Sequence, residues 1–382
     1  MLSDLVRGCA QILSEEELRK KLGENRPLRV KLGVDPTAPD IHLGHTVGLT
    51  KLRQFQELGH QAILIIGDFT AMIGDPSGRS ATRPQLTHDE VMANAKTYQD
   101  QAFKILDPEK TRVVFNGEWF EMMTFEEVIR LNSRVTLQQM LQREDFRERM
   151  DQGHPVRAHE IQYPIMQGWD SVMIQADVEL GGTDQLFNIM VGRDLQREEG
   201  QPQQVAMLLP ILEGTDGVQK MSKSLGNAIG VSEPPIEMFG KLMSIPDELM
   251  PRYYELLLVE KMPDGHPMEA KKALARRIVA RFHSEAEANH ALEDFNTRFS
   301  KRDLAHADLP SFTLLAGQDI VSNVVAAYSS INITKSRSEA RRLIEQGSVQ
   351  WNGEKIGDPK AVLPADARGI LKLDKTRAVR IG

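Results

Sequence analysis

The segment of residues 29–51, RVKLGVDPTAPDIHLGHTVGLTK, constrains the fold of this chain more than any other stretch. A short apolar run ends at a proline-rich turn, and a helical pattern begins at His42 and His45. This order predicts a strand, a loop and a helix N-terminus, where unpaired N–H groups and the helix dipole favour phosphate. Two histidines add donors for phosphate oxygens, so we predict an ATP site. The letters HLGH alone would favour a plain helix start with a glycine for close packing.

A second stretch, residues 213–230 with the sequence EGTDGVQKMSKSLGNAIG, carries complementary chemistry. Lys220 and Lys223 lie in a glycine-flanked loop with Ser222 and Ser224, which gives mobility, cations and hydroxyl donors. This combination suits negative charge that develops on a departing pyrophosphate. A lysine loop alone is usually a solvated turn, but that explanation is poor for a loop that accompanies the HLGH stretch.

Apolar runs alternate with helical patterns around these two stretches. Residues 29–34 and 61–67 predict parallel strands joined by a helix over 43–58. Ligands bind beyond the carboxyl ends of such strands, where Asp35 and Asp68 lie. Further strands are predicted at 112–116, 177–182 and 204–212. The chain is therefore predicted to begin with an α/β domain built on a parallel sheet.

Charged residues follow the second strand in a segment rich in glycine and small residues. Asp75 lies in a GDPSG turn, and Arg79 and Arg83 come shortly after it. The turn itself has a full structural explanation. The two arginines, on the same side as the histidines, fit a triphosphate.

Polar residues also gather on one predicted helix. Tyr163, Gln167 and Asp170 are spaced by four and three, so one helical face presents a phenol, an amide and a carboxylate. They bind a ligand or simply face solvent, and the spacing alone favours neither. Asp184 and Gln185 follow a glycine turn at the start of the next helix, where they suit a ribose or an amino-acid carbonyl; Asp184 also fits a plain helix cap.

Length, charge and cysteine content limit the class of protein. A chain of 382 residues predicts two or three domains. The net charge is −7, but residues 331–382 hold 11 Lys and Arg against 6 Asp and Glu, which leaves −12 for the remainder. This basic tail suggests a contact with a polyanion, although chance clustering on a solvated face gives the same count. The lone Cys9 excludes an intramolecular disulfide and a cysteine-cluster zinc site.

No apolar run is long enough to span a bilayer, and the first twenty residues lack a signal-peptide layout. We therefore expect a cytoplasmic protein with no membrane partner.

The rest of the chain predicts mainly helices. A charged helical insert at about 120–158 suggests an oligomer contact or a substrate cover, with Met140, Leu141 and Phe146 buried at a two-fold interface or a solvated helix as the alternative. Residues 234–258 and 269–299 predict an all-helical domain, and 304–329 predict an irregular connector. From Ile331 the pattern is a basic helix, a glycine turn and a strand.

The motifs HLGH after DPTAPD, GDPSG, YPIMQGWD, GGTDQ and KMSKS, in this order, resemble those of the bacterial class I tyrosyl-tRNA synthetases, and the tail resembles an S4 domain. The resemblance covers essentially the whole chain. It implies an α/β Rossmann-type catalytic domain with a parallel sheet (1–228), an all-helical anticodon-binding domain (229–325) and a small α+β S4-like domain (326–382). It also implies a homodimer that makes tyrosyl-AMP and then tyrosyl-tRNA(Tyr).

The resemblance implies roles for individual residues. The residues implied in catalysis are Thr37, His42, His45, Arg79, Arg83, Lys220 and Lys223. Those implied in ATP binding are His42, Leu43, Gly44, His45, Asp184, Lys220, Met221, Ser222, Lys223 and Ser224. Those implied in tyrosine binding are Asp35, Asp75, Tyr163, Gln167, Asp170 and Gln185. Mg²⁺ is expected to arrive with ATP, and no metal bound by the protein alone is expected.

Two positions depart from the family pattern. Lys31 stands where many members have a tyrosine that helps to bind the substrate hydroxyl, and Arg79 stands where many have lysine. Asp170 is then the main expected partner of the hydroxyl, and Lys31 is expected either to pair with Asp170 or to face solvent. Two other functions stay open: an adenylate-forming enzyme or synthetase for another substrate, and an RNA-binding protein with a vestigial site.

Overall fold

The computed structural model describes residues 2–77, 86–300, 304, 307–331 and 333–382. The chain forms two compact units, Met1–Asn289 and His290–Gly382. Within the described ranges, no helix combines the length and the apolar character needed to cross a membrane.

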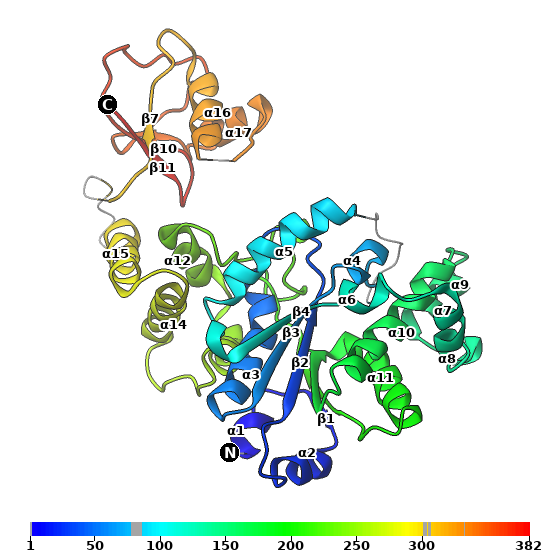
Figure 1. The fold of residues 1–382 in the computed structure, drawn as a ribbon. Coiled ribbons are helices and arrows are strands. Elements are labelled where there is room, and N and C mark those ends of the chain that lie inside the picture. Colours follow the sequence, from blue (N-terminus) through cyan, green and yellow to red (C-terminus); the bar gives the residue numbers. More distant parts are fainter. Residues whose placement is uncertain (1, 78–85, 301–303, 305–306, 332) are drawn as a thin grey trace. The chain divides into compact units, whose positions relative to one another are not determined.

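The first unit is built on a six-stranded sheet with the order β1-β6-β5-β2-β3-β4 (Figure 1). All neighbours pair in parallel except β1, which is antiparallel to β6. The predicted strands and the parallel α/β class are confirmed. The strands are β1 (Gln11–Leu13), β2 (Arg29–Val34), β3 (Gln61–Ile66), β4 (Thr111–Phe115), β5 (Val178–Gly182) and β6 (Val205–Leu209).

Helices cover both faces of this sheet. Leu32 of β2 lies where Gly48 of α3 (Leu43–Glu57) brings the helix close, since a Cβ on Gly48 would be 3.2 Å from the Leu32 side chain. The adjacent Lys31 points to the opposite face, toward α10 (Ala158–Met173). Figure 1 shows α5 (His88–Ala102) on the side of α3 and α11 (Leu186–Glu198) on the side of α10. Burial on both faces explains why the strands are almost continuously apolar.

The order of the strands reverses direction at β2. From β2 the chain moves outward through β3 to β4, and then returns past β2 to β5 and β6 on its other side. Such a switch point opens a crevice beyond the carboxyl ends of the two central strands. The fold therefore places the ends of β2 and β5, with Asp35 just after β2, at the expected ligand site.

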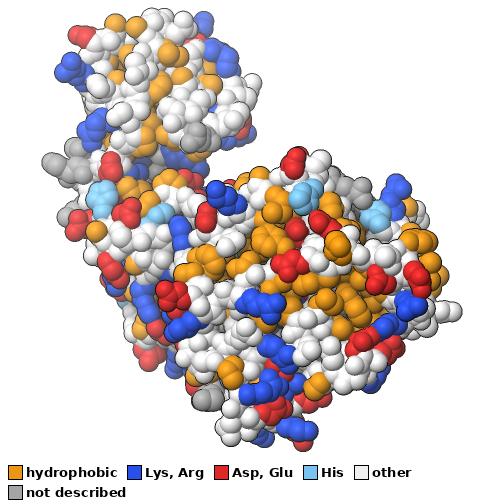
Figure 2. Space-filling view, viewed as in Figure 1, with side chains coloured by type: hydrophobic (Ala, Val, Ile, Leu, Met, Phe, Trp, Pro, Cys, Tyr) orange, Lys and Arg blue, Asp and Glu red, His pale blue; other side chains and the backbone are white. Residues whose placement is uncertain are grey.

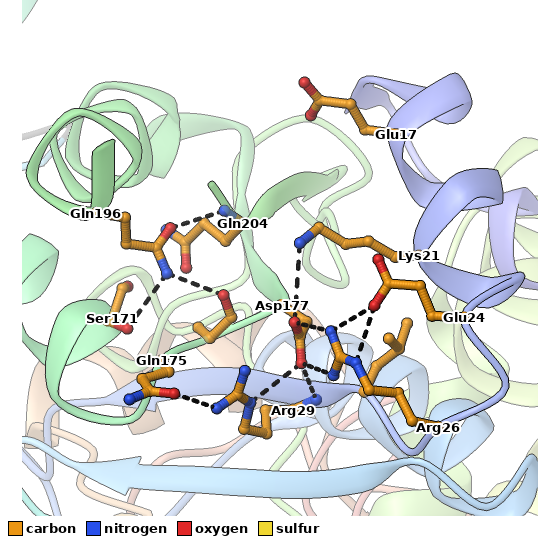
Figure 3. A network of polar contacts seen from close by, with 12 residues as sticks. Glu17, Lys21, Glu24, Arg26, Arg29, Ser171, Gln175, Asp177, Gln196 and Gln204 are labelled. Atoms are coloured by element: carbon orange, nitrogen blue, oxygen red, sulfur yellow. Dashed lines mark hydrogen bonds and ion pairs between the residues drawn. The ribbon is translucent and has the colours of Figure 1, made fainter. Parts of the chain in front are cut away.

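At the amino-terminal ends of β2 and β5, away from the crevice, the buried carboxylate of Asp177 links the two strands (Figure 3). Asp177, immediately before β5, accepts two hydrogen bonds from the guanidinium of Arg26 and two from the backbone N–H and Nε of Arg29. Lys21 of α2 (Glu15–Leu22) lies 3.8 Å away. Burial alone would raise the pKa of Asp177, but these donors outweigh it and hold that pKa well below its usual range.

The helical insert forms α7 (Phe125–Asn132), α8 (Leu137–Met140) and α9 (Glu144–Asp151). The expectation that Met140 and Phe146 bury at a two-fold interface is wrong, because both are already buried inside their own chain. Met140 belongs to a small core with side chains of α10 and α11.

The helices after residue 229 also differ from the predicted pattern. The predicted single helix over 269–299 is divided into α14 (Pro267–Phe282) and α15 (Glu285–Phe295). Ser284 begins the second helix by accepting from the backbone N–H of Glu287 and donating to its carboxylate. The remaining elements of this region are α12 (Pro235–Ser244), the 3-10 turn Asp247–Leu249, α13 (Met250–Tyr253) and the π-helical turns Tyr254–Leu258 and Asn296–Ser300.

The second unit contains a five-stranded sheet with the order β7-β11-β10-β8-β9. Its strands are β7 (Ser311–Phe312), β8 (Gln350–Trp351), β9 (Glu354–Lys355), β10 (Gly369–Lys372) and β11 (Ala378–Ile381). The helices α16 (Ile320–Ser330) and α17 (Arg337–Glu345) pack their apolar sides on it. The predicted irregular connector over 304–329 is therefore wrong, because most of α16 lies within it. The domain boundaries at 228 and 325 stay predictions, although this packing favours an earlier start for the last domain.

We expect Asp177→Asn to lower the free energy of unfolding of the first unit by about 1–3 kcal/mol, because three cations lose a buried partner. A depressed pKa stabilises the fold above the unfolded pKa of about 4, so the difference from the wild type should shrink as the pH falls below that value. Urea unfolding followed between pH 7 and 3 measures both effects. Glu57→Gln, which breaks the exposed Arg53–Glu57 pair, is the control with an expected change of under about 0.5 kcal/mol.

Candidate active site

A cavity of about 390 Å³ lies at the carboxyl ends of β2 and β5. Most of the site residues predicted from sequence line it, and these are Asp35, Thr37, His42, Gly44, His45, Asp75, Tyr163, Gln167, Asp170, Asp184, Gln185, Lys220, Met221 and Ser222. Leu43 does not line the cavity, because its side chain is buried in the core. Lys223 and Ser224 continue the loop beside the cavity. Arg79 and Arg83 lie outside the described residues.

His42 and His45 form the N-terminus of α3. Nδ1 of His42 accepts from the backbone N–H of Gly44, and Nδ1 of His45 accepts from the backbone N–H of His42. Burial lowers the pKa of His42 to about 3 and that of His45 to about 4, with the nearby charge of Lys223 acting in the same direction. Both rings are therefore neutral near pH 7, and each carries its proton on Nε2. Each Nε2 is left as a donor, which suits phosphate oxygens.

The backbone joins the two signature stretches. The N–H of Leu43 donates to the carbonyl of Ile229 over 2.9 Å, and the N–H of Val231 donates to the carbonyl of Ile41 over 3.1 Å. The segment after the lysine loop thus pairs with the segment that enters α3. At the exposed rim, Nζ of Lys223 lies 3.0 Å from the carboxylate of Asp40. The structure therefore brings the lysine loop and the HLGH helix to one cavity.

Asn227 holds the lysine loop by hydrogen bonds to both of its sides. Sequence reasoning did not identify this residue. Its side chain is buried; Oδ1 accepts from the backbone N–H of Ser222, and Nδ2 donates to the carboxylate of Asp216 and to the carbonyl of Lys220. Its backbone carbonyl accepts from Thr215. One amide thus joins both sides of the loop.

Tyr163 and Asp35 face each other across the cavity wall. The phenol of Tyr163 donates to Asp35 Oδ2 over 2.8 Å, and the hydroxyl of Thr70 donates to Asp35 Oδ1 over 2.9 Å. Burial, followed by the charge of Asp35, raises the pKa of Tyr163 well above its usual value. Tyr163 is therefore a neutral donor that fixes the orientation of this carboxylate.

Asp170, on the same helix as Tyr163, is a buried carboxylate that lines the cavity. Trp119 Nε1 donates to Oδ1 over 3.1 Å, and Asn116 Nδ2 donates to Oδ2 over 3.3 Å. Burial raises the pKa of Asp170 to about 7, against the opposing effect of Lys31 and of both donors. Sequence reasoning missed Trp119 and Asn116, because they follow a different strand and only the fold brings them to Asp170.

Amide side chains connect the remaining polar groups of the cavity. Asn188 Nδ2 donates to the side-chain oxygens Gln167 Oε1 and Gln185 Oε1, over 2.9 and 3.0 Å. Gln185 Nε2 in turn donates to Asp75 Oδ2 over 2.9 Å. Arg143 Nη1 donates to Asn188 Oδ1, which orients this central amide. Gln167, Gln185 and Asp75, three of the six residues predicted to bind tyrosine, are thus parts of one network.

Lys31 does not occupy either place expected for it. Its side chain is fully buried and Nζ lies 2.9 Å from Glu179 Oε1 on the neighbouring strand β5. It therefore neither faces solvent nor forms an ion pair with Asp170.

One group of three possible metal ligands occurs among the described residues, Asp68, His88 and Glu121. None of them lines the cavity, and His88 and Glu121 are half-exposed. The expectation that no metal is bound by the protein alone stays a prediction.

A parallel α/β sheet whose switch-point cavity is closed by an HLGH helix N-terminus and a KMSKS loop is the architecture of a class I aminoacyl-tRNA synthetase. Residues 23–300 match the family model of class I tRNA synthetases (W and Y), and the chain belongs to this family. Residues 329–367 match the S4 domain model.

Curated relatives match over nearly their whole length. The tyrosine–tRNA ligase of Oleidesulfovibrio alaskensis is 51% identical over 100% of this chain and 98% of its own. That of Aquifex aeolicus is 52% identical over 98% of this chain and 96% of its own.

Solved structures share the fold at lower identity. A C-terminally truncated mitochondrial tyrosyl-tRNA synthetase of Aspergillus nidulans has a TM-score of 0.65 at 21% identity and covers 78% of this chain and 93% of its own. The tyrosyl-tRNA synthetase of Archaeoglobus fulgidus, complexed with L-tyrosine, has a TM-score of 0.61 at 24% identity and covers 76% of this chain and 98% of its own.

We expect Asn227→Ala to loosen the lysine loop, because the backbone N–H of Ser222 and the carboxylate of Asp216 lose their partner. Losing buried hydrogen bonds should shift the loop toward its open form by about 1–3 kcal/mol, so trypsin should cleave after Lys220 or Lys223 at least about five times faster. Mass spectrometry of timed digests measures this. The control is Val218→Ala, which alters an exposed side chain of the same loop. Equal cleavage rates in both variants would show that Asn227 does not hold the loop.

Proposed function

We propose that this chain is a tyrosine–tRNA ligase that activates L-tyrosine with ATP to tyrosyl-AMP and pyrophosphate, and then transfers tyrosine to the 3′ end of tRNA(Tyr). The observation that carries the proposal is the cavity itself, because His42, His45 and Lys220, which suit a triphosphate, line it together with a buried carboxylate, Asp170. The similarity to tyrosine–tRNA ligases over nearly their full length supports it.

In this proposal the protein acts by positioning and by charge stabilisation. The tyrosine carboxylate attacks the α-phosphorus in line, and pyrophosphate leaves without any covalent enzyme intermediate. His42 and His45 donate from Nε2 to phosphate oxygens, with Thr37 at the γ-phosphate, while Lys220 and Lys223 neutralise the charge that develops on pyrophosphate. Asp184 accepts from the ribose. Mg²⁺ enters with ATP and is held mainly by phosphate oxygens and water.

The opposite side of the cavity selects the amino acid. Tyrosine and phenylalanine differ by one hydroxyl, and an apolar pocket separates such a pair only weakly. Asp170 has about four acceptor positions on its two oxygens, and Asn116 and Trp119 occupy two of them. A substrate hydroxyl can therefore donate to Asp170 without displacing either neighbour. Tyrosyl-tRNA synthetases are themselves the known example of such rejection, in which an analogue without the hydroxyl leaves buried polar groups unpaired.

We expect Asp170→Ala to lower kcat/KM for tyrosine by at least about a hundredfold and to change phenylalanine use much less. Exchange of labelled pyrophosphate into ATP, run with all natural amino acids and then with these two, tests the proposed function and the residue together. Exchange driven by another amino acid in the wild type would overturn the function.

The tyrosine-to-phenylalanine ratio should also depend on pH. A proton on Asp170 removes its negative charge and one acceptor position, which weakens its hydrogen bond with the substrate hydroxyl, so the ratio should fall as the pH drops through about 7, the pKa of this carboxyl. Asp170→Asn, which cannot ionise, should show a flat and low ratio. A parallel fall of both substrates in Asp170→Ala would assign Asp170 to the fold or to ATP instead.

We further propose that the S4-like region binds the tRNA and that the helices of residues 229–295 contact the anticodon. Arg341 and Arg342 are exposed on α17, and no ion pair involves them within the described ranges. Arg337 of the same helix is paired with Asp319 at 2.9 Å. The free guanidinium groups of Arg341 and Arg342 are the better candidates.

We expect the double variant Arg341→Gln/Arg342→Gln to charge tRNA(Tyr) more weakly, while tyrosyl-AMP formation stays unchanged. Each lost phosphate contact should reduce the slope of log affinity against log salt by about one. Filter binding across a salt series measures the slope, with the exposed Lys110→Gln of the first unit as the control. An unchanged slope would remove these arginines from the tRNA contact.

We also propose a cytoplasmic homodimer. Large hydrophobic side chains are exposed along the insert, with Met122 81% and Phe125 79% exposed, followed by Ile129 and Leu137. Figure 2 shows hydrophobic side chains gathered on the face where α6 (Gly117–Phe120), α7 and α10 lie. An apolar area of this kind is typical of a contact between protein chains.

We expect Phe125→Glu to weaken self-association at least about a hundredfold, because a two-fold contact loses the burial of this side chain twice, about 1.5–3 kcal/mol each time. Sedimentation equilibrium measures the dissociation constant. Val362→Glu alters an exposed apolar residue of the second unit and should leave the dimer intact. A Phe125→Glu variant that remains fully dimeric would contradict this interface.

A further inference from the structure

A buried ion pair lies under the amino-acid side of the cavity, where the sequence departs from the family pattern. We propose that Lys31 and Glu179 are positioning residues for tyrosine: the pair fixes the amide of Gln167 and sets the charge around Asp170. This inference rests on the proposed function, because it assigns Gln167 and Asp170 to the tyrosine site.

Lys31 has no unused donor. Its Nζ donates to the Gln167 backbone carbonyl over 2.8 Å and to Ser171 Oγ over 2.7 Å, and it lies 2.9 Å from Glu179 Oε1. The side chain is 0% exposed, so a charged ammonium is kept here only by these three acceptors. Lys31 and Glu179 are also direct partners in the pairing of β2 with β5, so the sheet itself holds the two side chains together.

Glu179 gathers donors from several elements. Oε1 faces Lys31 and accepts from Gln167 Nε2 over 3.2 Å, while Oε2 accepts from Ser171 Oγ over 3.0 Å and from Gln204 Nε2. A carboxylate only accepts, so the NH₂ end of Gln167 must point to Glu179. The carbonyl oxygen of Gln167 is then directed to Asn188 and the cavity. A glutamine has no such orientation of its own, and Glu179 supplies it.

The orientation of Gln167 continues into the rest of the amino-acid site. From Gln167 the hydrogen bonds run through Asn188 to Gln185 and on to Asp75. Oxygens that accept are what a substrate ammonium requires, since an ammonium group only donates. A reversed Gln167 amide would present a donor to that ammonium and remove one of the two acceptors of Asn188 Nδ2. The ion pair thus acts on tyrosine binding through the orientation of Gln167.

The same pair bears on Asp170. Lys31 opposes the burial that raises the pKa of Asp170, while Glu179 acts in the opposite direction and more weakly. The other groups near Asp170 are the neutral Tyr163, on the same helix, and the donors Asn116 and Trp119. Loss of the lysine cation should therefore raise the pKa of Asp170 further, so that at neutral pH more of this carboxyl is protonated and accepts from the substrate hydroxyl more weakly.

Three variants test the proposal by pyrophosphate exchange. Glu179→Gln should raise KM for tyrosine about tenfold and leave KM for ATP within about twofold, because only the amino-acid side loses its orientation. The inhibition constant of 3-(4-hydroxyphenyl)propionate, which lacks the ammonium, should stay near its wild-type value. Lys31→Met should move the pH midpoint of the tyrosine-to-phenylalanine ratio upward.

The double variant Lys31→Met/Glu179→Gln removes both charges, so neither is left buried without a partner. It should recover much of the melting temperature lost by either single variant, yet keep the raised KM for tyrosine. A matched control is Arg149→Met/Glu160→Gln, which removes another buried ion pair that does not line the cavity. This control should lower the melting temperature and leave KM for tyrosine and the pH midpoint unchanged.

Two outcomes would overturn the inference. In the first, the Lys31 and Glu179 variants lose stability, but when assayed below their melting temperatures they keep the wild-type KM for tyrosine and the wild-type pH midpoint. The pair is then only structural. Gln167 is not the link if the inhibitor without an ammonium weakens in parallel with tyrosine. Failure of the proposed function looks different, because the wild type itself would then show no exchange with tyrosine.

Discussion

The site depends on a backbone bridge between segments almost 190 residues apart. Through the two hydrogen bonds that link residues 41–43 with 229–231, the strand-to-helix turn that ends in His42 becomes part of the same surface as the lysine loop. Neither stretch alone explains a phosphate site, because a helix N-terminus binds many anions and a lysine loop is commonly solvated. Held together, they line one cavity, and Asn227 links the two sides of the lysine loop by hydrogen bonds.

Burial explains how the rest of the cavity is built. The ionisable groups at the amino-acid side are wholly or partly taken out of water, which costs free energy unless a specific partner replaces the solvent. Asp35 has Tyr163 and Thr70, Glu179 has Lys31, and Asp170 has two neutral donors but no cation in direct contact. This difference is reflected in the pKa of Asp170, which is raised to about 7. The burial of Asp170 is thus incompletely compensated, and the hydroxyl of the substrate would supply a further hydrogen-bond donor to it.

Local patterns made the strands, the HLGH helix and the lysine loop predictable, since each depends on neighbouring residues. The polar partners were not predictable in this way. Asn116, Glu179 and Asn188 belong to three different elements, and nothing in their own sequence neighbourhood marks them as neighbours of the cavity. Lys31 shows the same limit. Its departure from the family pattern is visible in the sequence, but only the strand pairing identifies its partner on β5.

The wrong expectations have physical causes as well. Met140 and Phe146 lie in a highly charged stretch, which concealed a small core that forms only when α10 and α11 pack against it. The division between α14 and α15 and the start of α16 were marked in the sequence, by Ser284 with Glu287 and by Asp319 with Ser322. In both cases a side-chain cap outweighed the apolar spacing of the segment, because capping supplies a partner for N–H groups that the first turn of a helix leaves unpaired. Caps therefore decide where these helices start, whereas the tertiary partners of buried charges decide what the cavity can bind.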